Sequence, residues 1–475
     1  MELKQLITLF QKQFPYIPTA GQERLIHELS SFILDKNPLS LFVLKGYAGT
    51  GKTTIVSALV NILPTLKKSF NLLAPTGRAA KVLGNYSGRN AHTIHRFIYW
   101  ATTTSDGRFK LVLRPNKQKD TIFIVDEASM IPDGLSSSDF SQAQRSLLED
   151  LINFVYSPQS NCKIILIGDE AQLPPVGLDI SPALNIEYLK ASFGLDIRTL
   201  SLKEVVRQSL DSGILANATK IRNKIEHNEL DFPFFDLTDF SDIHAIGGAD
   251  LEDLLNSSYS NFGHEHTVVI TRSNKRANVY NQQIRHRILF QEEEISAGDF
   301  MMVVKNNYFW LPEDSSAGFL ANGDIIEILS IRKIEELYGF RFADVSIKLI
   351  DYPNEAALDV KILLDTIAAE SPALPKAENN RLFEEVLKDY EDIPQRRKRL
   401  DKMKVDPYFN ALQIKFAYAL TCHKTQGGQW ANVFIDQGYF NEKMLDKEFL
   451  RWLYTAVTRA SNQLYLVNFK SEFIS

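Results

Sequence analysis

The sequence predicts an α/β fold built on an open parallel sheet. Three short apolar runs have the character of buried strands, and each ends in a cluster of polar residues: 41–44, 121–125 and 163–167. Ligands of such sheets bind at the carboxyl ends of the strands, where these polar clusters gather. At 475 residues the chain is too long for one core of ordinary size, so we expect two or more packed units.

Composition restricts the class of protein. Hydrophobic residues make up 44% of the chain and charged residues 23%, as in globular proteins, and a net charge of −5 means that any nucleic-acid binding must use a local track. Cys162 and Cys422 stand far apart, which argues against a disulfide framework or a zinc cluster and favours the cytoplasm. The sequence contains neither a signal-peptide core nor an apolar run of membrane-spanning length, so we expect no membrane partner.

The first strand leads into a glycine-rich loop that matches the pattern G-x-x-x-x-G-K-T, and helical apolar spacing follows it over 55–63. Glycines allow backbone N–H groups to turn toward one anion, Lys52 can reach the outer phosphates, and the Thr53 hydroxyl can bind magnesium. A chance match in a glycine-rich turn is the alternative. The predicted nucleotide-binding residues here are Gly46, Gly49, Thr50, Gly51, Lys52, Thr53 and Thr54.

The second strand ends in Asp126 and Glu127. At a strand tip, Asp126 can hold the magnesium shell while Glu127 faces the attacking water as general base. An acidic pair after a strand is otherwise most often a helix cap with a first-turn acid. The third strand runs into GDEAQLPP, where Gln172 could contact the γ-phosphate; the alternative there is a plain strand-to-turn joint.

The order of these blocks resembles that of the superfamily 1B helicases of the RecD and Dda type. GYAGTGKT, VDEAS and GDEAQLPP resemble that family's first three motifs, and APTGRAAKVL and HTIHRFI resemble its motifs Ia and Ib. VVRQ, ALTCHKTQGGQW and LYTAVTRASNQL resemble motifs IV, V and VI. The resemblance covers nearly the whole chain and implies two RecA-like lobes, with ATP and Mg²⁺ as cofactors.

The resemblance also implies roles for residues outside the loop. Arg207 and Arg459, in the second half of the chain, would reach the triphosphate when the lobes close and stabilise transition-state charge. An arginine is otherwise most often paired with a surface carboxylate. Gln22, placed before the first helix of the fold, would contact adenine, and Gly427 would line the same site.

A grip on a single strand is implied chiefly by the same family. Motifs Ia and Ib offer hydroxyls, helix N-termini and an aromatic ring, and motif V offers a counterpart in the second lobe. Phe97 is equally compatible with a place in the core. Asn274 follows a predicted strand, where its role could simply be to cap the next helix. The candidate nucleic-acid residues are Pro75, Thr76, Gly77, Arg78, Thr93, His95, Phe97, Phe109, Asn274, His423, Lys424 and Thr425.

Two insertions complete the predicted organisation. A hairpin around the turn signal Ser105-Asp106-Gly107 would be the family's pin, with Phe109 stacking on the last base pair, or else a solvated hairpin. Short alternating segments over 295–364 predict a small SH3-like β-barrel, and 370–403 a charged helical arm. The predicted segments are 1–95 and 121–200 for domain 1A, 96–120 for the 1B pin, 201–290 and 409–475 for domain 2A, and 291–408 for 2B.

The function implied is that of an ATP-dependent DNA helicase that moves 5′ to 3′ on single-stranded DNA and acts as a monomer. Its expected partners are single-stranded DNA, forked duplex DNA and proteins of replication or repair. Two alternatives stay open at this point. One is a translocase of opposite polarity or RNA preference, and the other is a nucleotide-gated switch that binds a protein and moves nothing.

Overall fold

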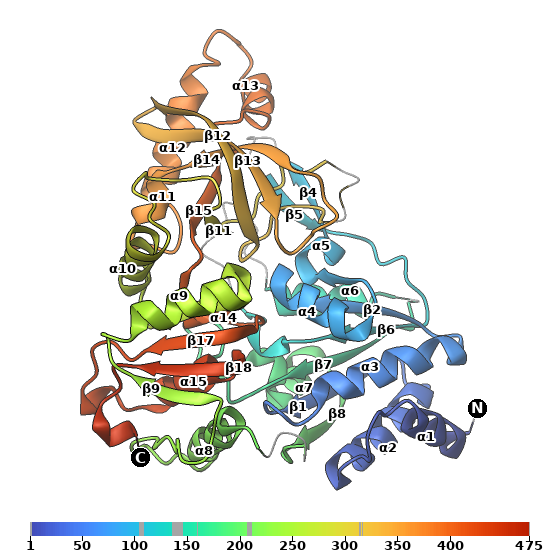
Figure 1. Cartoon of the computed structure of the whole chain (residues 1–475). Coiled ribbons are helices and arrows are strands. Elements are labelled where there is room, and N and C mark those ends of the chain that lie inside the picture. The colour runs from blue at the N-terminus through green and yellow to red at the C-terminus, as the bar shows by residue number, and fades with distance from the viewer. Residues whose placement is uncertain are drawn as a thin grey trace.

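The computed structural model has two parallel sheets side by side and a closed barrel above them (Figure 1). The structure describes residues 2–103, 109–134, 146–158, 160–206, 211–312, 315 and 317–474, and for 101–103, 109 and 110 it describes the backbone alone. The predicted fold class is confirmed, because both sheets are wholly parallel and carry helices on both faces.

The first lobe holds a six-stranded sheet. Its strands, in spatial order, are β3 (Ala91–Thr93), β2 (Ser69–Ala74), β6 (Thr121–Val125), β7 (Lys163–Gly168), β1 (Ser40–Gly46) and β8 (Asp196–Leu202). Successive residues of β1 point to opposite faces, so Phe42 and Leu44 pack in one core while Leu41 and Val43 pack in the other. Burial on both faces explains why the inner strands β1, β6 and β7 are continuous apolar runs instead of alternating ones.

The helices of the first lobe divide between these two faces. The core that holds Phe42 also holds side chains of α1 (Leu3–Lys12), α2 (Ala20–Leu34), α3 (Lys52–Ile62) and α4 (Gly77–Ser87). The opposite core holds side chains of α5 (Ile94–Ile98), α6 (Leu147–Val155) and α7 (Ile186–Phe193). Gln22 lies in the first turn of α2, so the expectation that it precedes the first helix was wrong.

The second lobe repeats this plan with five strands. In spatial order they are β16 (Ala419–Thr421), β10 (Thr267–Thr271), β17 (Trp430–Asp436), β18 (Ala460–Val467) and β9 (Ile243–Ile246). Helices α8 (Gly213–His227) and α15 (Lys447–Val457) cover one face, and α9 (Leu251–Phe262) and α10 (Asn274–Gln283) cover the other. The short helix α14 (Cys422–Thr425) follows β16 at the carboxyl edge.

The barrel interrupts the second lobe. It consists of β11 (Phe300–Val303), β12 (Ile325–Leu337), β13 (Phe340–Leu349), β14 (Leu358–Leu363) and β15 (Leu412–Phe416). β15 pairs with both β11 and β14 and so closes the barrel, which means that the predicted boundary at 408 falls short of the last barrel strand. A closed barrel has no free edges to protect.

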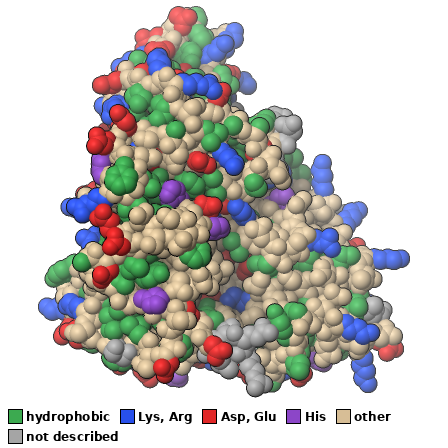
Figure 2. Space-filling view, in the orientation of Figure 1, with side chains coloured by type: hydrophobic (Ala, Val, Ile, Leu, Met, Phe, Trp, Pro, Cys, Tyr) green, Lys and Arg blue, Asp and Glu red, His purple; other side chains and the backbone are tan. Residues whose placement is uncertain are grey.

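The charged arm follows β14 and packs on the barrel at the top of Figure 1. The short helix α11 (Asp365–Ala368) precedes the arm, which contains α12 (Lys376–Lys388) and α13 (Arg396–Met403). Leu382, Val386 and Met403 bury against Phe340 and Phe342 of β13. Lys and Arg side chains lie interspersed with Asp and Glu over this part of the surface, in keeping with a solvated helical face (Figure 2).

The predicted hairpin is present in the first lobe. β4 (Tyr99–Thr103) pairs antiparallel with β5 (Phe109–Leu113), and Thr103 lies opposite Phe109 at the last described pair. The turn signal at 105–107 lies outside the described residues. Among the described helices, none combines the length and the apolar character needed to cross a membrane.

Candidate functional site

The glycine-rich loop joins β1 to α3 at the carboxyl edge of the first sheet. Gly49 and Gly51 have φ of 73° and 85°, a left-handed conformation that glycine adopts without strain. A Cβ on Gly51 would lie 2.5 Å from Nε2 of Gln22, so the loop also needs glycine there for space. The local sequence thus folds as a cradle at the start of α3, where the helix N-terminus favours an anion. Within the loop, the backbone N–H groups of Ala48 and Thr50 already donate to the Tyr454 hydroxyl and to the Tyr47 carbonyl oxygen.

Lys52 and Gln22 hold this cradle in its present shape. The Lys52 ammonium donates to the carbonyl oxygens of Gly46 at 2.5 Å and Tyr47 at 2.9 Å. Nε2 of the buried Gln22 donates to the carbonyl oxygen of Thr50 at 3.1 Å, and its Oε1 accepts from the backbone N–H of Thr19. A phosphate in the cradle would offer Lys52 a charged acceptor in place of two carbonyls.

Asp126 and Glu127 follow β6 and face the same cavity as the loop. Asp126 accepts a hydrogen bond from the Tyr86 hydroxyl at 2.5 Å and from the backbone N–H of Glu127 at 2.9 Å. Thr53 lines this cavity too, and a hydroxyl together with a carboxylate is the oxygen donor set that Mg²⁺ prefers. These residues therefore fit a nucleotide-bound magnesium ion.

Glu127 is held in an unusual setting. Its φ of 52° places a non-glycine residue in the left-handed region. Burial raises the pKa of its carboxyl, while the positive charges of Arg459 and Lys52 act in the opposite direction. A raised pKa makes the carboxylate a stronger base and so suits it to accept a proton from water.

Arg459 comes to this cavity from the second lobe. It is 4% exposed, and its Nε and Nη1 donate to the carbonyl oxygens of Thr455 at 3.0 Å and Gly428 at 3.2 Å. The cavity measures about 760 Å³ and is lined by Lys52 and Glu127 from one lobe and by Gly427 and Arg459 from the other. The predicted residue Arg207 lies outside the described residues.

A chain of hydrogen bonds crosses between the lobes next to this cavity. The Tyr454 hydroxyl of α15 donates to Asp169 at 2.7 Å and accepts from the backbone N–H of Ala48 in the loop at 2.9 Å. Burial raises the pKa of the Asp169 carboxyl. Sequence reasoning missed both Asp169 and Tyr454, although they lie inside two of the recognised motifs.

Gln172 lies among these groups. Its side chain is buried and lines the same cavity, and its Oε1 has no hydrogen-bond partner among the described residues. An unsatisfied buried amide oxygen is unfavourable, so a ligand that donates to it, such as the attacking water, would be stabilising.

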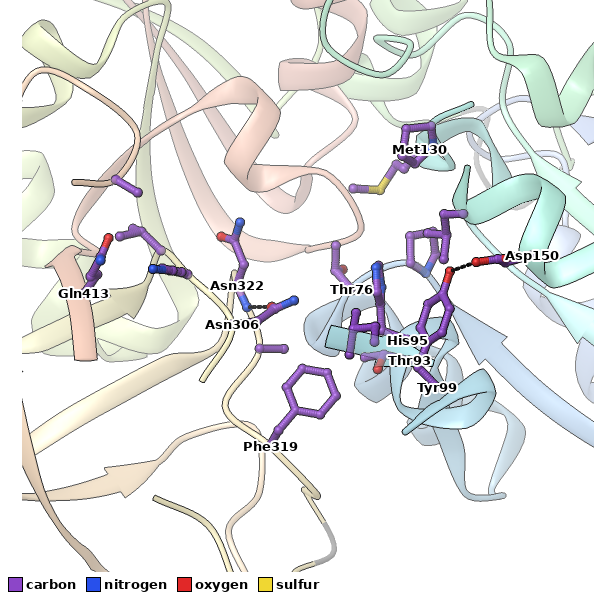
Figure 3. Close-up of a pocket in the computed structure, with 18 of the residues that line it drawn as sticks. Thr76, Thr93, His95, Tyr99, Met130, Asp150, Asn306, Phe319, Asn322 and Gln413 are labelled. Atoms are coloured by element: carbon purple, nitrogen blue, oxygen red, sulfur yellow. Dashed lines mark hydrogen bonds between the residues drawn. The ribbon is translucent and has the colours of Figure 1, made fainter. Parts of the chain in front are cut away.

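A second cavity of about 320 Å³ lies between the first lobe and the barrel (Figure 3). Pro75, Thr76, Thr93 and His95 line it from motifs Ia and Ib. The hydroxyls of Thr76 and Thr93 accept from the backbone at the starts of α4 and α5, which leaves each O–H free to donate to a phosphate. These four residues, each predicted to contact nucleic acid, thus line one cavity, and their binding to nucleic acid stays a prediction.

The opposite wall of this cavity comes from the barrel, which the sequence did not indicate. Asn306, Phe319 and Asn322 lie between β11 and β12 and face the first lobe (Figure 3). The Lys424 ammonium of α14 donates to Oδ1 of Asn322 at 2.7 Å. Burial lowers the pKa of Lys424 to about 8, so the cation is retained at neutral pH at the edge of the cavity.

Several other predicted nucleic-acid residues do not line this cavity. Phe97 packs edge-on against Phe123 and Phe154, as the core alternative predicted. Thr425 is fully buried and donates to the carbonyl oxygen of Cys422. Gly77, Arg78, His423 and Asn274 also lie away from it. Gly77 lies against the barrel, Arg78 stacks on Trp430, His423 is partly buried on α14, and Asn274 lies at the start of α10. The side chain of Phe109 on β5 is outside the part of the chain that the structure describes.

The expectation that Asn274 caps α10 was also wrong. The cap is Ser273, whose hydroxyl accepts from the backbone N–H of Arg276 at 3.2 Å. Asn274 is instead the first residue of the helix.

Two protein families match the chain. Residues 20–233 match the family described as AAA domain, and residues 416–467 match the family described as UvrD-like helicase C-terminal domain. The first match includes the glycine-rich loop, Asp126, Glu127 and Gln172, and the second includes Arg459. The two halves of the nucleotide cavity thus belong to two separate matched regions.

Individual relatives agree with these matches. The ATP-dependent RecD2 DNA helicase of Deinococcus radiodurans is 29% identical over 42% of this chain and 24% of its own length. The ATP-dependent DNA helicase dda of phage T4 is 30% identical over 43% of this chain and 42% of its own. The chain therefore spans less than half the length of either helicase in these matches. An uncharacterised protein of Acanthamoeba polyphaga mimivirus is 25% identical over 93% of this chain and 98% of its own length.

Among solved structures, Pif1 helicase from Bacteroides in complex with ADP-AlF3 and ssDNA covers 97% of this chain and 95% of its own. Its sequence is 14% identical and the TM-score is 0.48, so the overlay adds no weight to the sequence matches.

Proposed function

We propose, from the premise that this chain belongs to the superfamily 1B helicases of the RecD and Dda type, that it is an ATP-dependent DNA helicase moving 5′ to 3′ along single-stranded DNA. The observation that carries the proposal is the composition of the nucleotide cavity. Lys52 and Glu127 enter it from one lobe and Arg459 enters it from the other.

The proposed hydrolysis assigns one task to each group. Lys52 binds the outer phosphates, Glu127 accepts a proton from the attacking water, and Arg459 stabilises charge on the transferred phosphoryl group. Arg207 is proposed as a second arginine in that role, and Gln172 as the group that orients the water. Thr53 and Asp126 would hold Mg²⁺, which when bound offsets charge on the phosphate oxygens.

Closure of the lobes is the proposed link between chemistry and movement. An arginine supplied by one lobe stabilises a phosphate held by the other only while the lobes are together, so hydrolysis and release change the equilibrium between closed and open forms. The hydrogen bonds of Tyr454 to Asp169 and to the backbone N–H of Ala48 support this link, because they join the second lobe directly to the glycine-rich loop.

The strand is proposed to occupy the second cavity. Phosphates would accept from Thr76 and Thr93 and from the helix N-termini behind them, while bases would lie toward His95 and Phe319. The hairpin β4–β5 is proposed as the pin that meets the duplex. Forked DNA, replication or repair proteins as partners, a monomeric active form and a cytoplasmic location stay predictions.

Stimulation of the ATPase by single-stranded DNA tests this proposal against its rival. We expect the rate of ATP hydrolysis to rise severalfold when single-stranded DNA is added, because strand binding favours closure. A nucleotide-gated switch that binds a protein would show the same rate with and without DNA. An equal response to single-stranded RNA would move the proposal to the RNA-preferring alternative.

A further inference from the structure

Arg78 in the first lobe stacks on Trp430 in the second. The guanidinium carbon lies 3.7 Å from the centre of the Trp430 ring, and Nη2 donates to the carbonyl oxygen of Gln429 at 3.3 Å. Burial lowers the pKa of Arg78; the negative charge of Asp351 acts against this shift and the positive charge of Arg459 adds to it. Arg78 is thus engaged at the lobe interface and does not line the second cavity.

Two glycines allow this approach. A Cβ on Gly428 would lie 2.6 Å from Nε of Arg78 and 2.7 Å from the Trp430 ring. A Cβ on Gly427 would lie 2.7 Å from Cβ of Ala79, and Gly427 has a φ of 72°. Any larger side chain at these positions would push the second lobe away from α4.

The same segment of the second lobe also holds Arg459. Nη1 of Arg459 donates to the carbonyl oxygen of Gly428 at 3.2 Å. The backbone N–H of Trp430 donates to the carbonyl oxygen of Arg459 at 3.0 Å. Residues 427–430 therefore contact Arg459 of the nucleotide cavity on one side and Arg78 on the other.

Arg78 lies at the end of α4 that faces the second cavity. The helix begins at Gly77, and its cap Thr76 lines that cavity. One helical turn further on, Lys81 donates to Asp351 of the barrel at 3.1 Å. A shift of residues 427–430 would thus be transmitted to α4 at the point where it meets the proposed strand.

We propose that the stack of Arg78 on Trp430 is a positioning contact that couples the nucleotide cavity to the N-terminal end of α4. This inference rests on the proposed function. When Arg459 moves with the bound nucleotide, residues 427–430 move with it, and the stack carries that movement to Thr76.

Trp430→Leu and Trp430→Phe test the contact with two smaller apolar side chains, of which only Phe is aromatic. Leu keeps an apolar side chain but removes the aromatic face, and Phe keeps a face on which the guanidinium can lie. We expect Trp430→Leu to lower the DNA-stimulated ATPase rate by about three- to tenfold with basal hydrolysis within about twofold of wild type, and Trp430→Phe to restore most of the stimulation. Equal stimulation in all three proteins would overturn the inference, and so would a parallel loss of basal rate and thermal stability.

Arg78→Gln separates coupling from direct DNA contact. If Arg78 acts through Trp430, the double variant Arg78→Gln/Trp430→Leu loses no more stimulation than the single variants, and the Kd for single-stranded DNA changes little. A Kd raised by Arg78→Gln and not by Trp430→Leu would mean that Arg78 binds DNA itself, which overturns the inference. Arg381→Gln is the control, because Arg381 lies 4.2 Å over Phe340 in the charged arm, away from both cavities.

Hydrogen exchange tests the contact without DNA. A non-hydrolysable ATP analogue should increase protection of Gly77–Ser87 in wild type and Trp430→Phe but not in Trp430→Leu. Protection retained in Trp430→Leu would contradict the coupling. The result stands even if DNA fails to stimulate wild type, so failure of this inference and failure of the proposed function are distinguishable.

Discussion

A buried acid behind α4 gives the sharpest quantitative prediction. Asp324 of the barrel is 1% exposed and lies directly against Gly77. Its Oδ2 accepts from the backbone N–H of Ala321 at 2.7 Å, whereas Oδ1 has no partner among the described residues. Burial, with the negative charge of Asp351 beside it, raises the pKa of Asp324 to about 8. The acid is therefore neutral at pH 7.

The sign of the pH dependence follows from this shift. The unfolded chain releases the Asp324 proton near the ordinary value of 3.8, and the folded chain holds it until about 8. The contribution of the Asp324 carboxyl to the free energy of unfolding is therefore fully present below pH 4. It is lost as pH rises toward 8, by at most about 1.4 kcal/mol per pH unit. Asp324→Asn keeps the shape of the neutral acid and removes this loss.

Thermal unfolding of both proteins from pH 5 to pH 9 measures the effect. We expect the gain in Tm of Asp324→Asn over wild type to grow from pH 5 to pH 8 and then to level off. Asp299→Asn is the control, and it should lower Tm where Asp324→Asn raises it. The Asp299 carboxylate pairs with the buried Arg285 at 2.9 Å, so its loss leaves an unpaired cation. A difference between Asp324→Asn and wild type that stays constant with pH would refute the argument.

Three further predictions concern the two cavities. Glu127→Gln should slow ATP hydrolysis by about 100- to 10,000-fold while nucleotide affinity is kept, and a loss below tenfold would exclude Glu127 as the base. Lys424→Gln should weaken single-strand binding at pH 7 and lower the dependence of log K on log salt concentration by about 0.7. Above pH 9 the two proteins should bind alike, because Lys424, with a pKa of about 8, has lost its charge in wild type. An unchanged salt dependence would contradict this. Gly428→Ala should lower the free energy of unfolding by about 1–3 kcal/mol, since the added methyl meets Arg78 and Trp430, and an unchanged denaturation midpoint would contradict that.

Local signals account for the parts of the fold that the sequence predicted. The strand before the glycine-rich loop and the helix after it are contiguous in the chain, so apolar spacing and glycine positions suffice to recognise them. β6 has the predicted bounds, Thr121–Val125, because a fully buried parallel strand is one uninterrupted apolar run. Short alternating segments identified the barrel in the same way.

The remaining features depend on contacts between distant residues. β15 closes the barrel only because Met301 and Phe416 pair across more than a hundred residues, and no local pattern marks that register. Tyr454 bonds to Asp169 and Ala48 across the lobes. Arg78 stands in a motif that suggests DNA contact, yet a tryptophan in the other lobe binds it. Sequence spacing carries no information on such pairings.

Strand displacement on tailed duplexes tests the central claim most directly. Equal amounts of a duplex with a 5′ single-stranded tail and of one with a 3′ tail would be mixed with protein and ATP, with Glu127→Gln as the inactive reference. Separation of the 5′-tailed strands alone, and only with hydrolysable ATP, is what joined lobes driving movement from 5′ toward 3′ would produce. Hydrolysis without separation of either duplex would contradict it.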